Sequence, residues 1–171
     1  MRDLPRIGLA TAAAVFVADQ LTKWIVTGPL GIRALGDVRE LLPVFDLRFV
    51  PNIGVSLGLL PAGSPTMRWA LVLLTAAIAA AVAVWMTRER DTRDQAALGL
   101  VFGGALGNIL DRVRFGYVVD FADLHFPTPW DPQWRPFLVF NVADAAITVG
   151  VVILLLRALF AGREPTEKVN A

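Results

Sequence analysis

The strongest constraint on the fold is a set of four apolar stretches, each long enough to cross a membrane. A helix needs roughly 20 residues to cross about 30 Å of hydrocarbon. The stretches lie at residues 7–26, 67–86, about 96–113 and about 137–160. Because 56% of the 171 residues are hydrophobic, the chain carries more apolar surface than a soluble domain of its size could bury. We predict a mostly α-helical integral membrane protein, a single domain over residues 1–171 built on a bundle of four transmembrane helices.

The composition excludes several classes of function. With 16 basic and 15 acidic residues the net charge is only +1, which argues against a nucleic-acid partner. Because the chain has no cysteine, it can form neither disulfides nor thiolate sites. His125 is the one histidine, so a histidine-rich metal centre is not expected either. We predict no metal and no cofactor.

The positions of lysine and arginine predict the topology. Basic residues crowd the N-terminal end, the second connection and the C-terminal end, whereas the long connections at 27–66 and 114–136 contain few. Cytoplasmic loops carry the excess of basic residues in membrane proteins. Both termini are therefore expected in the cytoplasm, with a disordered tail at about 163–171.

The two long outer connections differ in character. Residues 44–60 partly alternate apolar and polar side chains around Pro51 and Gly54, a pattern that favours a half-buried strand. We expect a small extracytoplasmic β-sheet between the first two helices. The connection at 114–136 is rich in aromatic residues and proline, which is typical of an interfacial belt.

Charged and polar residues within the apolar stretches need a partner or a purpose, because a charge inside a membrane costs several kcal/mol. Asp19 and Lys23 are spaced i, i+4, so they either neutralise each other or support a nearby site. Asn108 and Arg112 share one face of the third, glycine-rich stretch. Arg112 could pair with its neighbour Asp111 or hold a substrate carbonyl group.

Two further acids are candidates for a catalytic pair. Asp120 lies just beyond the third stretch, and Asp144 shares a face of the fourth stretch with Asn141. Asp144 is expected about two turns into its helix, deeper than a capping residue, and Asp123 is the rival acid near Asp120. Taken alone, Asp120 is an ordinary loop acid, but the outer ends of the third and fourth helices can bring it to Asp144. Two adjacent carboxylates share one proton, so that one activates water while the other donates a proton.

Five segments resemble, in order, the signature blocks of the lipoprotein signal peptidases, or signal peptidase II family. They are DQLTK (19–23), NIGVSLG (52–58), GGALGNILDR (103–112), GYVVDF (116–121) and FNVADAAI (140–147). Ser56 and Leu57 stand where that family usually has Ala-Phe.

The resemblance implies an aspartic endopeptidase of the bacterial cytoplasmic (inner) membrane, with Asp120 and Asp144 as catalytic residues near the outer leaflet. It further implies removal of signal peptides from prolipoproteins, N-terminal to a cysteine that carries diacylglycerol. Supporting or substrate-binding roles would fall to the matching motif residues Asp19, Lys23, Asn52, Gly54, Asn108, Arg112 and Asn141. The expected partners are the lipid-modified prolipoprotein, membrane lipid and globomycin-type inhibitors, and the protein is expected to be a monomer.

Two other classes of function would also place acids inside a membrane. A small proton-coupled transporter uses them as proton relays, but no internal repeat supports that alternative. In a non-enzymatic assembly factor, the acids would be structural ion pairs.

Overall fold

The computed structural model describes residues 4–54, 64–126, 128–131, 134 and 137–161. Its helices are α1 (Arg6–Thr27), α2 (Pro65–Arg88), α3 (Thr92–Phe115) and α4 (Val142–Ala161). Its strands are β1 (Val38–Leu42), β2 (Phe45–Asn52) and β3 (Val118–Leu124). Four helices in the described part of the chain are long and apolar enough to cross a membrane, as the sequence predicts. Residues 163–171, expected to be disordered, lie outside the described residues.

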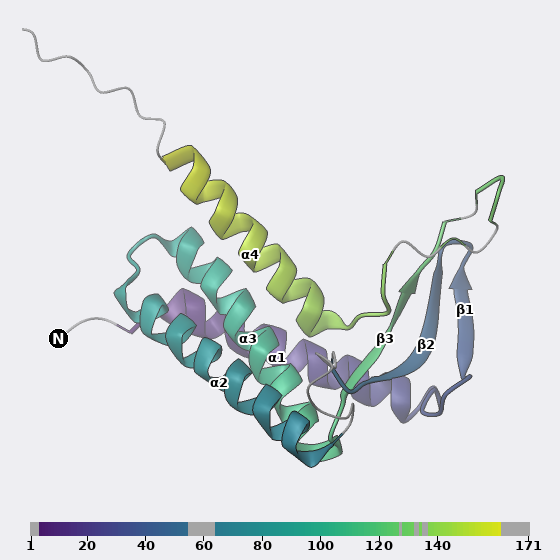
Figure 1. Ribbon diagram of the computed structural model, residues 1–171. Coiled ribbons are helices and arrows are strands. Elements are labelled where there is room, and N and C mark those ends of the chain that lie inside the picture. Colours follow the sequence, from purple (N-terminus) through teal and green to yellow (C-terminus); the bar gives the residue numbers. More distant parts are fainter. Residues whose placement is uncertain (1–3, 55–63, 127, 132–133, 135–136, 162–171) are drawn as a thin grey trace, which may run out of the picture.

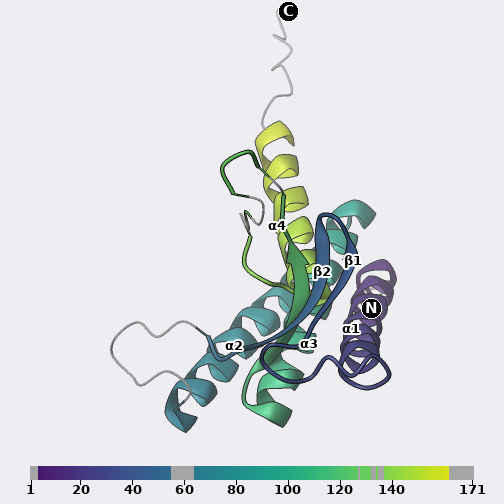
Figure 2. The ribbon, with the colours of Figure 1, turned by 90° about the vertical axis from the view of Figure 1, so that its right-hand side faces the viewer.

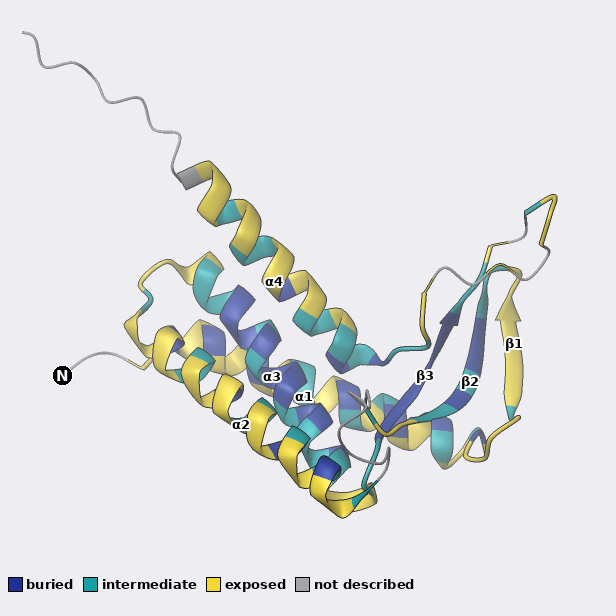
Figure 3. Cartoon of the chain, in the orientation of Figure 1, coloured by how far each residue is buried: buried dark blue, intermediate teal, exposed yellow. Residues whose placement is uncertain are grey.

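Helix α3 is the centre of the bundle, and α1, α2 and α4 all pack against it (Figure 1). Of its apolar window 56% is buried, against 22% or less in the other three helices. Small residues allow this close approach. A Cβ atom on Gly103 would collide with the backbone of Ala12 in α1, and one on Gly104 would collide with Ala143 in α4. Figure 3 shows the result, with exposed residues on the outer faces of α2 and α4 and buried residues along α3.

The three strands form an antiparallel sheet in the order β1-β2-β3, at one end of the bundle. The N-terminus, the α2–α3 connection and the end of α4 all lie toward the other end (Figure 1). Strand β2 lies between its neighbours (Figure 2). Apolar side chains such as Leu47, Phe49 and Phe121 join the sheet to Val26 near the end of α1. The sheet is thereby fixed to the bundle.

Two details of the prediction need correction. The sheet is not confined to the connection between the first two helices, since β3 comes from the connection after α3, where we expected only an interfacial belt. Helix α4 begins at Val142 rather than near 137, because the backbone of Phe140 pairs with Ala122 of β3. Residue 140 is therefore held by the sheet, and the helix can start only after it.

Candidate active site

Asp120 is placed by the register of the sheet. It lies opposite Val50 in the β2–β3 pairing and is only 1% exposed. Both of its carboxylate oxygens accept hydrogen bonds from amide groups. Asn52 Nδ2 donates to Oδ2 at 2.9 Å, and Asn141 Nδ2 donates to Oδ1 at 2.7 Å. Asp120 is thus a buried, oriented carboxyl group rather than an ordinary loop acid.

Asp144 is placed by the start of α4. It lies in the first turn, which corrects our expectation that it sits about two turns into the helix. Asn141 Oδ1 accepts the backbone N–H of Asp144 at 2.9 Å, and Asp144 Oδ2 accepts the backbone N–H of Asn141 at 3.3 Å. This reciprocal pattern is that of a capping box. It helps to fix the orientation of the Asp144 carboxylate at the start of α4.

Asn141 brings the two acids together. The same residue caps α4 around Asp144 and donates its side-chain N–H to Asp120. Asn108 of α3 supports this arrangement by donating to Asp144 Oδ1 at 2.8 Å, while its own oxygen accepts from Asn141 at 3.2 Å. Asp123 does not join them. It pairs with Arg48 at 3.0 Å, and an odd separation from Asp120 places the two on opposite faces of the strand.

The pKa of Asp120 is raised from its ordinary value of 3.8 to about 7, first by burial and second by the negative charge of Asp144. The amides of Asn52 and Asn141 and the charge of Lys23 oppose this shift, but they do not cancel it. Desolvation favours the uncharged form of a carboxyl group, and a neighbouring carboxylate does the same. Asp120 can therefore retain a proton near neutral pH.

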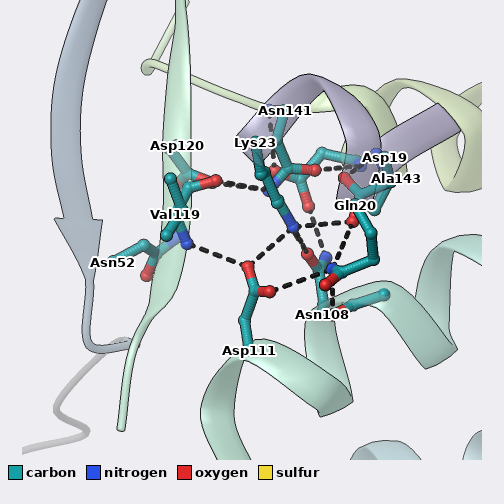
Figure 4. Close-up of polar contacts among 12 residues, drawn as sticks. Asp19, Gln20, Lys23, Asn52, Asn108, Asp111, Val119, Asp120, Asn141 and Ala143 are labelled. Carbon is teal, nitrogen blue, oxygen red and sulfur yellow. Dashed lines mark hydrogen bonds and ion pairs between the residues drawn. The ribbon is translucent and has the colours of Figure 1, made fainter. Parts of the chain in front are cut away.

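A buried network of Asp19, Lys23 and Asp111 lies close to Asp120 and Asn141 (Figure 4). Lys23 Nζ lies 2.8 Å from Asp19 Oδ2 and 2.7 Å from Asp111 Oδ2. Asp111 thus pairs with Lys23, whereas a pairing of Asp111 with Arg112 was one of the alternatives drawn from the sequence. Gln20, which the sequence reasoning missed, donates to both Asp19 and Asp111 at 3.1 and 3.0 Å. The sequence signal that could have identified Gln20 is its position beside Asp19 within an apolar membrane-spanning stretch.

The network also contacts the backbone next to each acid. Asp19 Oδ1 accepts the N–H of Ala143 at 3.0 Å, one residue before Asp144. Asp111 Oδ2 accepts the N–H of Val119 at 3.1 Å, one residue before Asp120. Asp19 and Lys23 thus form an ion pair, and Asp19 also contacts the backbone next to Asp144, so the two alternatives drawn from the sequence are compatible.

Arg112 and Gly54 border the acids in different ways. The charges of Asp144, Asp120 and Asp111 all act on the half-buried Arg112, and its Nε has no hydrogen-bond partner among the described residues. Gly54 has a φ of +87°, and its N–H donates to Asn52 Oδ1 at 2.9 Å. That bond leaves the Asn52 amide nitrogen directed at Asp120. Ser56 and Leu57 lie outside the described residues.

An apolar cavity of about 530 Å³ opens beside Asp144. It lies between the end of β3 and the first turns of α4, and its lining includes Phe140, Val149 and the side of Asp144 itself. Within the described ranges, no group of three or more His, Cys, Asp or Glu side chains is placed to hold a metal ion. The site therefore combines a carboxyl pair, a cation and an apolar cavity.

A polytopic membrane protein with such a carboxyl pair has the features of a membrane aspartic peptidase, and the comparisons agree. The family model described as Signal peptidase (SPase) II matches residues 11–160. This chain belongs to the signal peptidase II family. The lipoprotein signal peptidase of Sphingopyxis alaskensis is 54% identical over 93% of this chain and 88% of the relative. That of Rhizorhabdus wittichii is 52% identical over 99% of this chain and 97% of the relative.

A solved structure also resembles the fold. A bacterial membrane enzyme determined at 2.3 Å resolution superposes with a TM-score of 0.75 and 29% identity, over 96% of this chain and 94% of that one. The resemblance noted in the sequence is thereby confirmed, as is a multi-pass membrane protein with peptidase function. Nothing in these comparisons supports the transporter alternative.

Proposed function

We propose that this chain removes the signal peptide from diacylglyceryl-modified prolipoproteins, cutting N-terminal to the lipidated cysteine, with Asp120 and Asp144 as its catalytic residues. The observation that carries the assignment of residues is the joint contact of Asn141 with both carboxyl groups. Membership of the signal peptidase II family supports the reaction. The relatives from Sphingopyxis and Rhizorhabdus are both named lipoprotein signal peptidases.

The chemistry follows from the sharing of one proton by the pair. At neutral pH one carboxyl group is ionised and accepts a proton from a water molecule, which attacks the carbonyl carbon of the scissile peptide bond. The protonated partner donates to the oxygen on which negative charge develops. The raised pKa of Asp120 supports this state, in which the pair holds a single proton. As the C–N bond breaks, the proton taken from water passes to the departing amine, and a hydroxyl group of the intermediate returns its proton to the other carboxylate, so that the pair again holds one proton.

Neighbouring residues supply binding and orientation. Arg112 has an unsatisfied Nε beside the acids, so it can hold a carbonyl oxygen of the substrate backbone. Asn52, oriented by Gly54, and Asn108 keep the two carboxyl groups in place. The apolar cavity beside Asp144 suits an apolar part of the substrate. Asp19, Lys23 and Asp111 act through the backbone next to the acids.

The proposed location is the bacterial cytoplasmic membrane, with both termini in the cytoplasm and the acid pair near the outer leaflet. The start of α1, the α2–α3 connection and the end of α4 lie toward the same end of the bundle, which supports this topology (Figure 1). A diacylglyceryl group stays in the outer leaflet, so a peptidase that cuts beside it needs its acids at that depth. We further propose inhibition by globomycin-type peptides and action as a monomer.

The test uses a lipidated precursor and the purified protein in detergent. Asp120→Asn and Asp144→Asn should each abolish the mobility shift that accompanies cleavage, because neither variant can share a proton in the same way. Circular dichroism and thermal unfolding should show that both variants keep the fold. Asp123→Asn, which removes a carboxyl group from the same strand but the other face, should retain cleavage.

Full cleavage by either variant of the pair would contradict the assignment. EDTA should leave the wild-type rate unchanged, since the proposed mechanism has no step on a metal ion. A marked loss with EDTA would point instead to a metal-dependent hydrolase.

A further inference from the structure

A second cavity, of about 200 Å³, lies between the end of α1, the end of α3 and the sheet. It is separate from the apolar cavity beside Asp144, and the two share no lining residue. Its lining contains three cationic side chains, Lys23, Arg33 and Arg114, and one acid, Asp111. We propose that this cavity binds the phosphate headgroup of an anionic glycerophospholipid.

The charge in the cavity favours an anion. Lys23 is held by two carboxylates, so it adds no net positive charge to the cavity. Arg33 and Arg114 are exposed, and neither forms an ion pair with an acid in the described ranges. Arg33 and Asp37 influence each other through their charges, while the Asp37 carboxylate accepts hydrogen bonds from the backbone N–H groups of residues 33 and 34. Two guanidinium groups at one opening suit the oxygen atoms of a phosphate.

The position of the cavity favours a lipid over a soluble anion. Its rim includes Trp24 and Phe115, which lie in the last turns of α1 and α3 and are 62% and 47% exposed. The ends of membrane-spanning helices lie at the level of the headgroups, where aromatic side chains are enriched. Phosphate groups of the bilayer are therefore present at this height.

An exposed apolar strip on α1, suited to an acyl chain, begins at the same opening. Val17, Leu21 and Trp24 are spaced i, i+4 and i+7, so they lie on one face of α1. Their exposed fractions are 59%, 50% and 62%. This strip leads from the cavity toward the middle of the helix, as the chain of a lipid held by its phosphate would. A basic opening above an exposed apolar strip matches the two parts of a phospholipid.

The test is native mass spectrometry of the full chain released from micelles that contain equal amounts of phosphatidylglycerol and phosphatidylcholine. The wild type should retain phosphatidylglycerol in preference to phosphatidylcholine. The double variant Arg33→Gln/Arg114→Gln should bind phosphatidylglycerol about tenfold more weakly or worse, as expected when two charge-assisted contacts of at least about 1.4 kcal/mol in total are lost. Arg39→Gln/Arg88→Gln removes two exposed charges elsewhere and should bind as the wild type does.

Three results would overturn the proposal. They are equal retention of the two lipids by the wild type, unchanged phosphatidylglycerol binding by the Arg33 and Arg114 double variant, and an equal loss in the control variant. Glycerophosphoglycerol, which has the same headgroup without acyl chains, serves as a competitor. If it displaces the lipid at equal concentration, the site binds a soluble phosphate ester instead. Because the readout is binding, its failure is distinct from a failure of the proposed peptidase activity.

Discussion

The side chain of Asn141 makes two different contacts. Its side-chain oxygen caps α4, and its side-chain nitrogen binds Asp120. A helix start and a strand are therefore joined through one amide group. Because Asp144 lies in the same capping box, the position of one acid is linked to that of the other. A shift of α4 along the sheet would break both contacts together.

The raised pKa of Asp120 predicts a pH dependence of stability. Its pKa is about 7 in the folded protein against an ordinary 3.8, so between these values the folded state holds a proton that the unfolded state has lost. Stability from this group is full below pH 3.8 and falls as the pH rises toward about 7. At about 1.4 kcal/mol per pKa unit, the effect is on the order of a few kcal/mol.

Thermal unfolding of the wild type and Asp120→Asn, measured in detergent from pH 4 to pH 8, checks this prediction. The Asn side chain cannot ionise, so the Tm of the wild type should fall relative to that of the variant as the pH rises. Parallel curves for the two proteins would show that Asp120 titrates normally.

At the scale of secondary-structure elements, the network of Asp19, Lys23 and Asp111 connects four of them. It joins α1 and α3 by ion pairs and reaches the backbones of β3 and α4. Gly107 makes this possible, because a Cβ atom there would lie 3.2 Å from Asp19 Cγ. The elements that hold the two proposed catalytic acids are therefore fixed to the same cation.

Substitutions in this network should differ in severity. Lys23→Met leaves two buried carboxylates without a cation and should cost about 3–5 kcal/mol of stability, the usual effect of breaking a buried pair. Asp111→Asn leaves the pair between Lys23 and Asp19 intact, so it should lower Tm and cleavage only in part. The measurements are Tm and precursor cleavage for both variants and for Asp120→Asn, and they rank the severity of the substitutions. Complete loss of cleavage in a folded Asp111→Asn protein would instead place Asp111 among the catalytic residues.

Across the molecule, the sheet lies at one end of the bundle, whereas the start of α1 and the end of α4 lie toward the other end (Figure 1). The acid pair lies where the sheet meets α3 and α4. Basic residues are concentrated near the termini and the α2–α3 connection. By the excess of lysine and arginine in cytoplasmic loops, the sheet and the acid pair should face away from the cytoplasm.

The absence of cysteine permits a clean test of this orientation. Ala34→Cys places a thiol in the exposed connection before the sheet, and Thr92→Cys places one at the exposed first residue of α3. In spheroplasts, a membrane-impermeant maleimide should label the first variant and not the second. After lysis both should react. Labelling of Thr92→Cys alone before lysis would invert the topology.

Parts of the fold escaped prediction for a physical reason. Strand β3 is buried along nearly its whole length, on both faces, so its sequence VVDFADL shows none of the alternation that marks a half-buried strand. Residues 137–141 precede α4, but they are mostly apolar, so the sequence pattern predicts them as the first turn of the helix. Hydrophobicity alone does not distinguish a helix from a strand-like segment that pairs with a buried sheet.

The four membrane spans, the grouping of basic residues and the family of the chain all follow from the amino-acid sequence alone. These features are local, because a membrane imposes length and apolarity on each span separately. Only the tertiary structure decided that Asp111 pairs with Lys23 rather than Arg112, and that Asn141 binds both acids. Those choices depend on contacts between residues far apart in the chain, such as Asp19 with Ala143. Local spacing carries no information about which of several nearby polar groups such a residue will meet.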